Sequence, residues 1–168
     1  EDLTIRKIID IDTSKFDVEP LWEFVGLEDG RLFRWDNKMY LCGVRRDTTT
    51  NGQGRMELSE LHVKTDLVRE IKRTRIPAPG ANDTYCEKNW MPIIDMPYHF
   101  VKWSNPTEVV KVDPINKTCE TVHLGSYVEK PFDYRGGSQV ITLGDYRVAL
   151  THTCNLFKSE QGKKNAIY

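Results

Sequence analysis

Three tyrosines mark a repeat in this sequence. Tyr40, Tyr98 and Tyr146 each follow a turn between two short apolar runs, and each has a charged residue eleven positions before it. These charged residues are Asp29, Glu87 and Arg135. The tyrosines are 58 and 48 residues apart, which is within the period range of propeller blades or solenoid units. Each copy is therefore expected to form the same kind of structural unit.

Each unit contains short strand-like segments separated by turn residues. In the first unit, about residues 21–75, Trp35-Asp36-Asn37-Lys38 predicts a turn, because Asp and Asn tolerate a left-handed backbone. Segments 55–64 and 66–71 predict its third and outer strands, and residues 1–20 predict an edge strand or a connector. The second unit, about residues 84–128, predicts strands at 90–94, 98–103, 108–112 and 119–124. The third unit, about residues 133–168, repeats the first half of the pattern with strands at 139–143 and 146–152.

Four strands per repeat at this period predict an all-β fold, a β-propeller of four-stranded antiparallel blades. An antiparallel sandwich is the alternative, because it also has evenly spaced short strands. The polar residue before each first strand favours the propeller. Closed propellers have about four to eight blades, and about three blades alone would leave open sheet edges. We therefore expect a single domain of 168 residues that forms part of a larger propeller, completed by the rest of the protein or by an oligomeric partner.

Composition excludes several classes of partner. The chain has 24 basic and 25 acidic residues, so its net charge of −1 provides no overall field toward nucleic acid or an anionic membrane. The sequence has no run of eighteen apolar residues and no apolar core near its first residue. We expect a cytoplasmic protein that contacts neither nucleic acid nor membrane.

The four cysteines do not predict a metal site. Their spacings of 44, 33 and 35 residues match no paired-cysteine zinc pattern, and we expect no metal and no cofactor. Reduced cysteines that pack as small apolar residues are the expected state.

The charged residues of the repeat are the candidate site. In a propeller the first strand of each blade lines the axis, so Asp29 and Glu87 are expected to face one cavity together with Arg135. Two carboxylates in one cavity are typical of glycosyl transfer, in which one protonates the leaving oxygen and the other assists or activates the nucleophile. Arg31, Lys88 and Arg135 are candidates for binding a phosphate or a sugar carboxylate. Trp90 adjoins this motif and offers a ring that could stack on a sugar.

The same segments resemble a known family. Glu28-Asp29-Gly30-Arg31-Leu32-Phe33, followed by Tyr40-Leu41-Cys42-Gly43, is similar to the Glu-Asp-Pro-Arg segment of the five-bladed glycosidase-like propellers, the group of arabinanases, invertases and mannoside phosphorylases. Glu87-Lys88-Asn89-Trp90-Met91-Pro92 and Arg135-Gly136-Gly137-Ser138 resemble a branch often found beside glycosyltransferase domains. Gly30 replaces the proline of the family pattern.

The resemblance implies a carbohydrate-active propeller of five blades with a sugar pocket on its axis. It implies that Asp29 is the catalytic or transition-state-stabilising acid and that Arg31 is its neighbour. The sugar or phosphate contacts that it implies are Lys88, Asn89, Arg135 and His152. The expected ligand is an oligosaccharide or glycan, and phosphate is a further candidate.

Alternatives remain open for the function and for each residue. The protein could be a glycoside hydrolase, a phosphorylase or a glycosyltransferase-associated module, or it could be a non-catalytic glycan-binding or protein-interaction propeller. Asp29-Gly30 and Arg135-Gly136-Gly137 could be turns, Glu87-Lys88 a solvated loop, and His152 a strand-end histidine. The sugar hypothesis requires that Asp29, Glu87 and Arg135 share one cavity.

Overall fold

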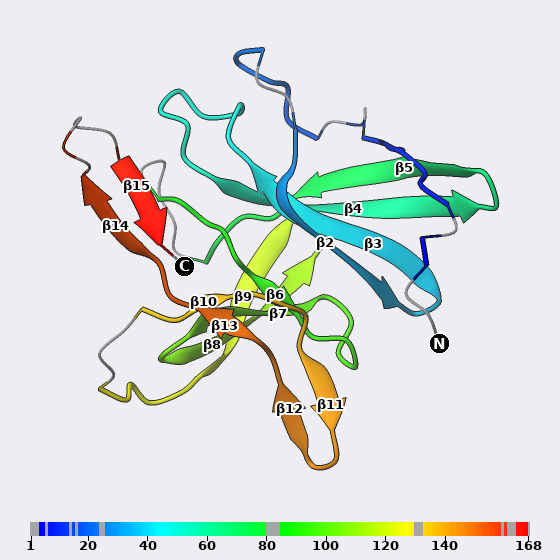
Figure 1. Ribbon diagram of the computed structural model, residues 1–168. Coiled ribbons are helices and arrows are strands. Elements are labelled where there is room, and N and C mark those ends of the chain that lie inside the picture. The colour runs from blue at the N-terminus through cyan, green and yellow to red at the C-terminus, as the bar shows by residue number, and fades with distance from the viewer. Residues whose placement is uncertain are drawn as a thin grey trace.

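The computed structural model describes residues 4–5, 7–13, 15, 17–23, 26–79, 85–129, 133–158, 160 and 164–167. In this part of the chain all the regular elements are β-strands, so the protein is all-β as the sequence predicts. Two antiparallel sheets of four consecutive strands make up most of it, and a parallel edge strand extends the first of them. Figure 1 shows these two sheets near the centre and two hairpins that project away from them.

Apart from its edge strand β1, the first sheet lies within the predicted first unit. Its strand order is β1-β5-β4-β3-β2, and β1 is parallel to β5 while the other pairs are antiparallel. Its strands are β1 (Ile11–Asp12), β2 (Glu28–Trp35), β3 (Lys38–Arg45), β4 (Arg55–Lys64) and β5 (Leu67–Arg75). Asp36 and Asn37 form the two-residue β2–β3 turn with φ values of 47° and 64°, which confirms the predicted turn. The predicted edge strand, third strand and outer strand correspond to β1, β4 and β5.

The second sheet lies within the predicted second unit, and its order β6-β7-β8-β9 follows the sequence. Its strands are β6 (Met91–Pro92), β7 (His99–Ser104), β8 (Thr107–Asp113) and β9 (Thr118–Leu124). Each of these strands overlaps one predicted segment of this unit, with bounds that differ by no more than two residues.

The third unit differs from the expected four-stranded blade. Its elements pair only two by two: β10 (Arg135–Gly136) with β13 (Thr151–His152), β11 (Ile141–Leu143) with β12 (Tyr146–Val148), and β14 (Asn155–Lys158) with β15 (Lys164–Ile167). Between the β10–β13 pair and the β11–β12 pair, the Leu150 N–H donates to the Ser138 hydroxyl at 2.9 Å, a side-chain acceptor in place of a main-chain carbonyl. The described strands form no closed ring of blades.

An aromatic core joins the first two sheets. Trp35, 1% exposed, lies with its ring centroid 5.3 Å from that of Phe100 and 5.4 Å from that of Tyr98. Its indole N–H donates to the Ile93 carbonyl at 2.8 Å, and the Tyr40 and Tyr98 hydroxyls are 3.0 Å apart. Two of the tyrosines that mark the repeat therefore meet in this core.

A smaller cluster joins the second sheet to the third unit. Met91, Ile93 and Val140 are buried there, and a parallel bridge pairs Ile93 with Val140. The beginnings of the second and third units therefore lie side by side, and this arrangement positions residues that the sequence singles out.

The cysteines are free in the described part of the chain. Burial raises the pKa of Cys42 to about 12, and burial also raises the pKa of Cys119 to about 12. Both thiols are therefore protonated at neutral pH, as expected of cysteines that pack as apolar side chains. Within the described residues no helix has the length and apolar character needed to cross a bilayer.

Candidate functional site

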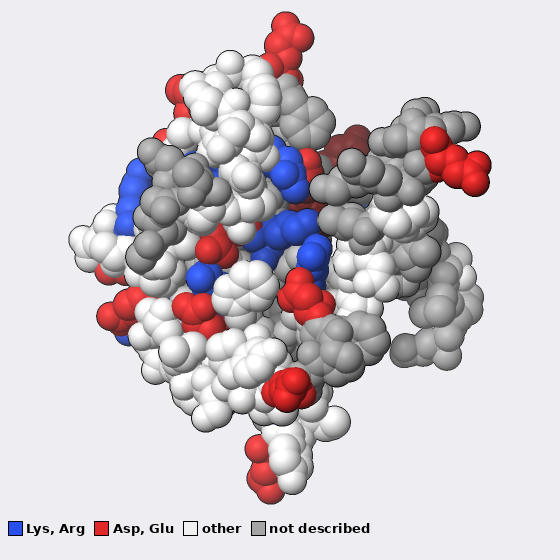
Figure 2. Space-filling model, turned by 90° about the vertical axis from the view of Figure 1, so that its left-hand side faces the viewer, with Lys and Arg blue, Asp and Glu red and all other residues white. Residues whose placement is uncertain are grey.

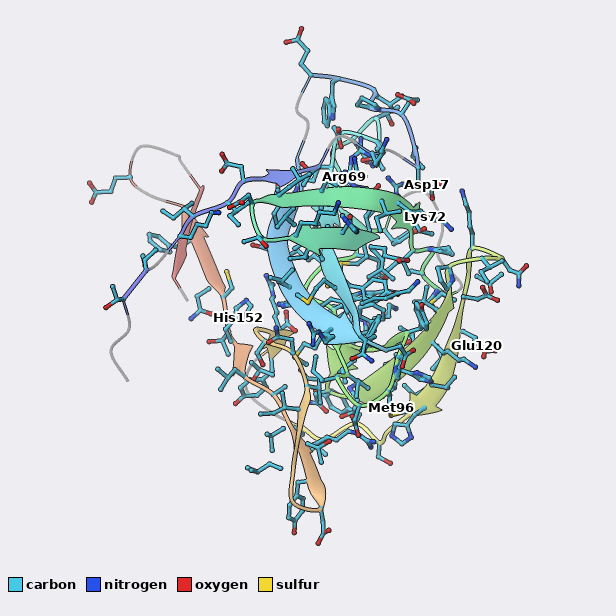
Figure 3. All side chains as sticks on the ribbon, turned by 90° about the vertical axis from the view of Figure 1, so that its right-hand side faces the viewer. Asp17, Arg69, Lys72, Met96, Glu120 and His152 are labelled. Atoms are coloured by element: carbon cyan, nitrogen blue, oxygen red, sulfur yellow. The ribbon has the colours of Figure 1, made fainter. Side chains whose placement is uncertain are left out.

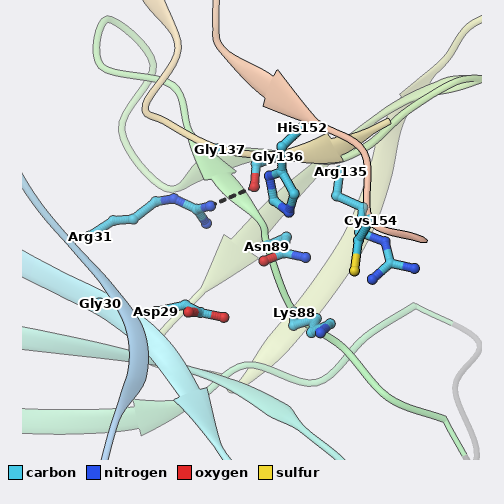
Figure 4. A pocket seen from close by; sticks show the side chains of 10 residues that line it. All are labelled: Asp29, Gly30, Arg31, Lys88, Asn89, Arg135, Gly136, Gly137, His152 and Cys154. Atoms are coloured by element: carbon cyan, nitrogen blue, oxygen red, sulfur yellow. Dashed lines mark hydrogen bonds between the residues drawn. The ribbon is translucent and has the colours of Figure 1, made fainter. Parts of the chain in front are cut away.

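A pocket of about 470 Å³ opens where the first strands of the three units begin (Figure 4). We call it the main pocket. Its lining residues come from β2, from the segment before β6, and from β10 and β13 with their neighbours. They are Asp29, Gly30, Arg31, Lys88, Asn89, Arg135, Gly136, Gly137, His152 and Cys154.

Unusual backbone geometry shapes the rim of the main pocket. Asp29 has a φ of 53° at a β-bulge between Glu28 and Arg31, and Asn89 has a φ of 64°. Asp and Asn adopt this left-handed conformation more readily than most residues. At Gly136 a Cβ atom would lie 2.2 Å from the Asn89 carbonyl oxygen, so only glycine lets these two backbones approach so closely.

Arg31 ties the three units together at the floor of the main pocket. Its Nη1 donates to the Trp90 carbonyl and its Nη2 donates to the Gly136 carbonyl, each at 2.7 Å. The guanidinium therefore supports the wall of the pocket while its charge remains next to the cavity, as Figure 4 shows for the Gly136 contact.

The main pocket is cationic. The described part of its lining contains the side chains of Arg31, Lys88 and Arg135 but the carboxylate of only Asp29. Arg135 donates from Nε to Asp133 at 3.0 Å, and its side chain is 25% exposed. Lys and Arg side chains gather around a central hollow on the face that lies to the left in Figure 1, with acidic side chains beside them (Figure 2). Such a hollow favours an anionic group on the ligand.

His152 and Asn89 add an imidazole and an amide to the lining. His152 pairs with Arg135 across β10 and β13, so both side chains project from neighbouring strands at the same level. Asn89 provides an amide that both donates and accepts hydrogen bonds. These are the kinds of group that recognise hydroxyl-rich or phosphorylated ligands.

Glu87 lies outside the main pocket. Its residue is 8% exposed, and its Oε2 accepts a hydrogen bond from the Trp90 indole N–H at 2.8 Å. Its Oε1 is 3.4 Å from the Lys102 ammonium. Because Glu87 is held by these two groups, the structure brings Asp29 and Arg135 into one cavity but does not bring Glu87 into it.

Trp90 is also withdrawn from the main pocket. Its side chain is completely buried, and its ring centroid lies 5.9 Å from that of Phe100 in the core. No face of this ring is open for stacking on a sugar. The other six candidates line the main pocket: Asp29, Arg31, Lys88, Asn89, Arg135 and His152.

A second cavity adjoins the main pocket, and we call it the side cavity. Its volume is about 160 Å³, and Lys88, Asn89, Arg135 and Gly136 line both spaces. The residues found only in the side cavity are Cys86, Glu87, Met91, Lys102, Trp103, Ser104, Asp133 and Tyr134.

Sequence reasoning missed two parts of this site. It did not single out Cys154, which lies two positions after His152 and lines the main pocket. It also did not single out Lys102 and Trp103, which lie in β7, after the Glu87 motif. The other two units have different residue types at the equivalent positions of the repeat, so the repeat pattern did not point to them. The described residues contain no group of three or more His, Cys, Asp or Glu side chains that could hold a metal ion.

Comparison with protein families, with curated proteins and with solved structures finds no match for this chain. The geometry of the two cavities is therefore the basis on which a function can be argued.

Proposed function

We propose that this chain is a carbohydrate-active protein that binds an oligosaccharide in the main pocket. The observation that carries the proposal is the convergence of six polar side chains from three successive units on one cavity. Glycan sites need both hydrogen-bond donors and hydrogen-bond acceptors around a concave space. This lining supplies carboxylate, amide, imidazole, ammonium and guanidinium groups.

A β-propeller is the architecture that we propose for the whole assembly. Two features support it: the strands of each four-stranded sheet follow in sequence order, and the parallel Ile93–Val140 bridge sets neighbouring first strands side by side. In this proposal the exposed apolar side chains of the β11–β12 hairpin, such as Ile141 and Leu143, are a packing surface for another blade. That blade would belong to the same protein or to a second copy.

Asp29 is the proton donor in the proposed reaction, because it is the only carboxylic acid among the described residues that line the main pocket. Hydrolysis by paired carboxylates would need a second one, and Glu87 is engaged by Trp90 and Lys102. Phosphorolysis needs only one acid. Phosphate held by Lys88 and Arg135 attacks the anomeric carbon, a new carbon–oxygen bond forms to phosphate, the glycosidic bond breaks, and Asp29 protonates the departing oxygen.

Glycan binding without catalysis is the second candidate. The observation that favours it is the position of Glu87, which leaves a single acid beside a cationic cavity. A binding protein would use the same contacts and release the sugar unchanged.

The test is turnover of an oligosaccharide panel in the presence of inorganic phosphate, with Asp29→Asn as the key variant. Asn tolerates the φ of 53° at this position, so the variant should fold with an unchanged melting temperature. Loss of a general acid should lower the rate about 100-fold or more. Asp36→Asn is the matched control, because Asp36 also has a positive φ, 47°, but lies in the β2–β3 turn away from the pocket.

Turnover that is lost in Asp29→Asn and kept in Asp36→Asn would support the catalytic role. Unchanged turnover in Asp29→Asn would overturn that role. Binding of panel sugars by the wild-type protein without any turnover would establish the binding function instead.

A further inference from the structure

We propose that the side cavity is a subsite for an uncharged sugar residue linked to the sugar that the main pocket holds. This inference rests on the proposed function and specifies its substrate as a disaccharide or a longer chain. It assigns the recognition of the second sugar to Trp103.

The two cavities adjoin each other. Lys88, Asn89, Arg135 and Gly136 line both, so these four residues are the boundary that the two spaces share. A glycan held by Lys88 or Arg135 in the main pocket is therefore adjacent to the side cavity. A second ring joined through a glycosidic bond extends into it.

A bulge in β7 opens one wall of the side cavity. Lys102, Trp103 and Ser104 are consecutive, and all three line it. In a regular strand neighbouring side chains would point to opposite faces. The β7–β8 register shifts between Val101 and Trp103, and such bulges re-aim side chains next to binding sites.

Trp103 offers the apolar platform that a sugar ring needs. Its side chain is 44% exposed, whereas Trp35 and Trp90 are 1% and 0% exposed in the core. A large aromatic ring left open in a cavity presents an apolar face beside polar groups, which suits the apolar face and polar edge of a pyranose.

The charges found only in the side cavity differ from those of the main pocket. Lys102 lies 3.4 Å from Glu87 and 3.4 Å from Glu108, and these three side chains are between 10% and 14% exposed. Asp133 adds another carboxylate, so the described lining of the side cavity has three cations, Lys88, Lys102 and Arg135, and two carboxylates, whereas the described lining of the main pocket has three cations and one carboxylate. Carboxylates accept hydrogen bonds from sugar hydroxyls. The side cavity is thus the less cationic of the two and the richer in acceptors for the hydroxyls of a neutral sugar.

The experiment is an array of monosaccharides and matching disaccharides, with and without a phosphate group on one ring, followed by titration of the sugars that bind. We expect a bound phosphorylated disaccharide to bind about tenfold more tightly than its phosphorylated monosaccharide. Trp103→Ala should remove this tenfold gain in affinity, while its affinity for the monosaccharide stays within about twofold of the wild-type value.

Trp22→Ala is the matched control, because Trp22 is also 44% exposed but lines neither cavity. Trp103→Phe retains an aromatic face and should keep most of the gain in affinity of the disaccharide over the monosaccharide. Circular dichroism verifies that each variant is folded.

The outcomes separate the two proposals. If disaccharides bind no better than monosaccharides, or if Trp103→Ala weakens both equally, the subsite is overturned while the main pocket remains a sugar site. If the wild-type protein binds no sugar on the array, the proposed function fails and the subsite fails with it.

Discussion

At the scale of single residues, the site depends on a few backbone positions that the sequence only partly indicates. Asp29 and Arg135 could be predicted because each stands eleven residues before a tyrosine of the repeat. Glu87 has the same spacing, yet its carboxylate is held by the Trp90 indole and by Lys102. The spacing gave no sign of this, since Lys102 reaches Glu87 from β7, outside the repeated motif.

Gly136 is the residue at which a small change should have the largest effect. A Cβ atom there would meet the Asn89 carbonyl oxygen at 2.2 Å and Met91 Cγ at 2.5 Å, so backbone or core must shift. We predict that Gly136→Ala lowers the free energy of unfolding by about 1–3 kcal/mol, measured by urea denaturation.

Gly26→Ala is the control for this substitution. Among the described residues beyond its chain neighbours, no atom lies within 4 Å of the Cβ that it would add, so its effect should stay within about 0.5 kcal/mol. Equal effects of the two variants would contradict the close backbone approach at Gly136.

At the scale of elements, the N-terminal segment packs on the first sheet through charged groups. Arg45 donates to the Val18 carbonyl at 3.0 Å, and Arg73 donates to the Thr13 carbonyl at 2.9 Å. These arginines are buried together with Asp47, Glu57 and Glu70. The described buried side-chain polar atoms all have hydrogen-bond partners, so this network satisfies groups whose burial would otherwise be costly.

Asp17 anchors the segment and should make its stability depend on pH. Asp17 lies at the Lys72 end of β5 (Figure 3), where it accepts a hydrogen bond from the Arg75 N–H at 2.7 Å and pairs with Lys117. Burial raises the pKa of this carboxyl, but the hydrogen bonds from Lys117 and the Arg75 backbone outweigh that effect, and the pKa is lowered from 3.8. A lowered folded-state pKa stabilises the fold above the unfolded value, and this stabilisation is lost as the pH falls through the folded value.

We therefore predict that Asp17→Asn destabilises the protein by about 1 kcal/mol at pH 7. The difference from wild type should persist down to about pH 4 and shrink below it, as urea midpoints at several pH values would reveal. Asp66→Asn serves as the control, because the Asp66 side chain is 78% exposed and should contribute little. A difference that does not change with pH would contradict the role of the Asp17 charge.

The elements also mark the limit of prediction from sequence. The β2–β3 turn and the four strands of the second sheet could be predicted, because turn residues and apolar alternation are local signals. The break in the third unit could not, because the Leu150 N–H at this point takes the Ser138 hydroxyl as its acceptor. A serine in the sequence gives no sign of which partner its side chain will take.

At the scale of the whole molecule, Arg31 connects the three units. Its guanidinium reaches the Trp90 and Gly136 carbonyls at 2.7 Å, so one residue of β2 bonds to the second and third units. Lysine lacks the planar fork that makes two such bonds at fixed positions. We predict that Arg31→Lys destabilises the protein by about 1.5–3 kcal/mol, measured by thermal or urea denaturation.

Arg34→Lys in the same strand is the matched control, because Arg34 is exposed and should change stability by less than about 0.5 kcal/mol. Similar melting temperatures for the two variants would show that Arg31 does not hold the units together.

The position of Arg31 also means that occupancy of the main pocket and docking of the three units are linked equilibria. A ligand that binds only when β2, the segment before β6 and β10 are assembled stabilises that assembly by mass action. The linkage is reciprocal. A contact that stabilises the docked arrangement of the units, even one far from the cavity, also raises the affinity for the ligand, and the coupling free energy is the same in both directions.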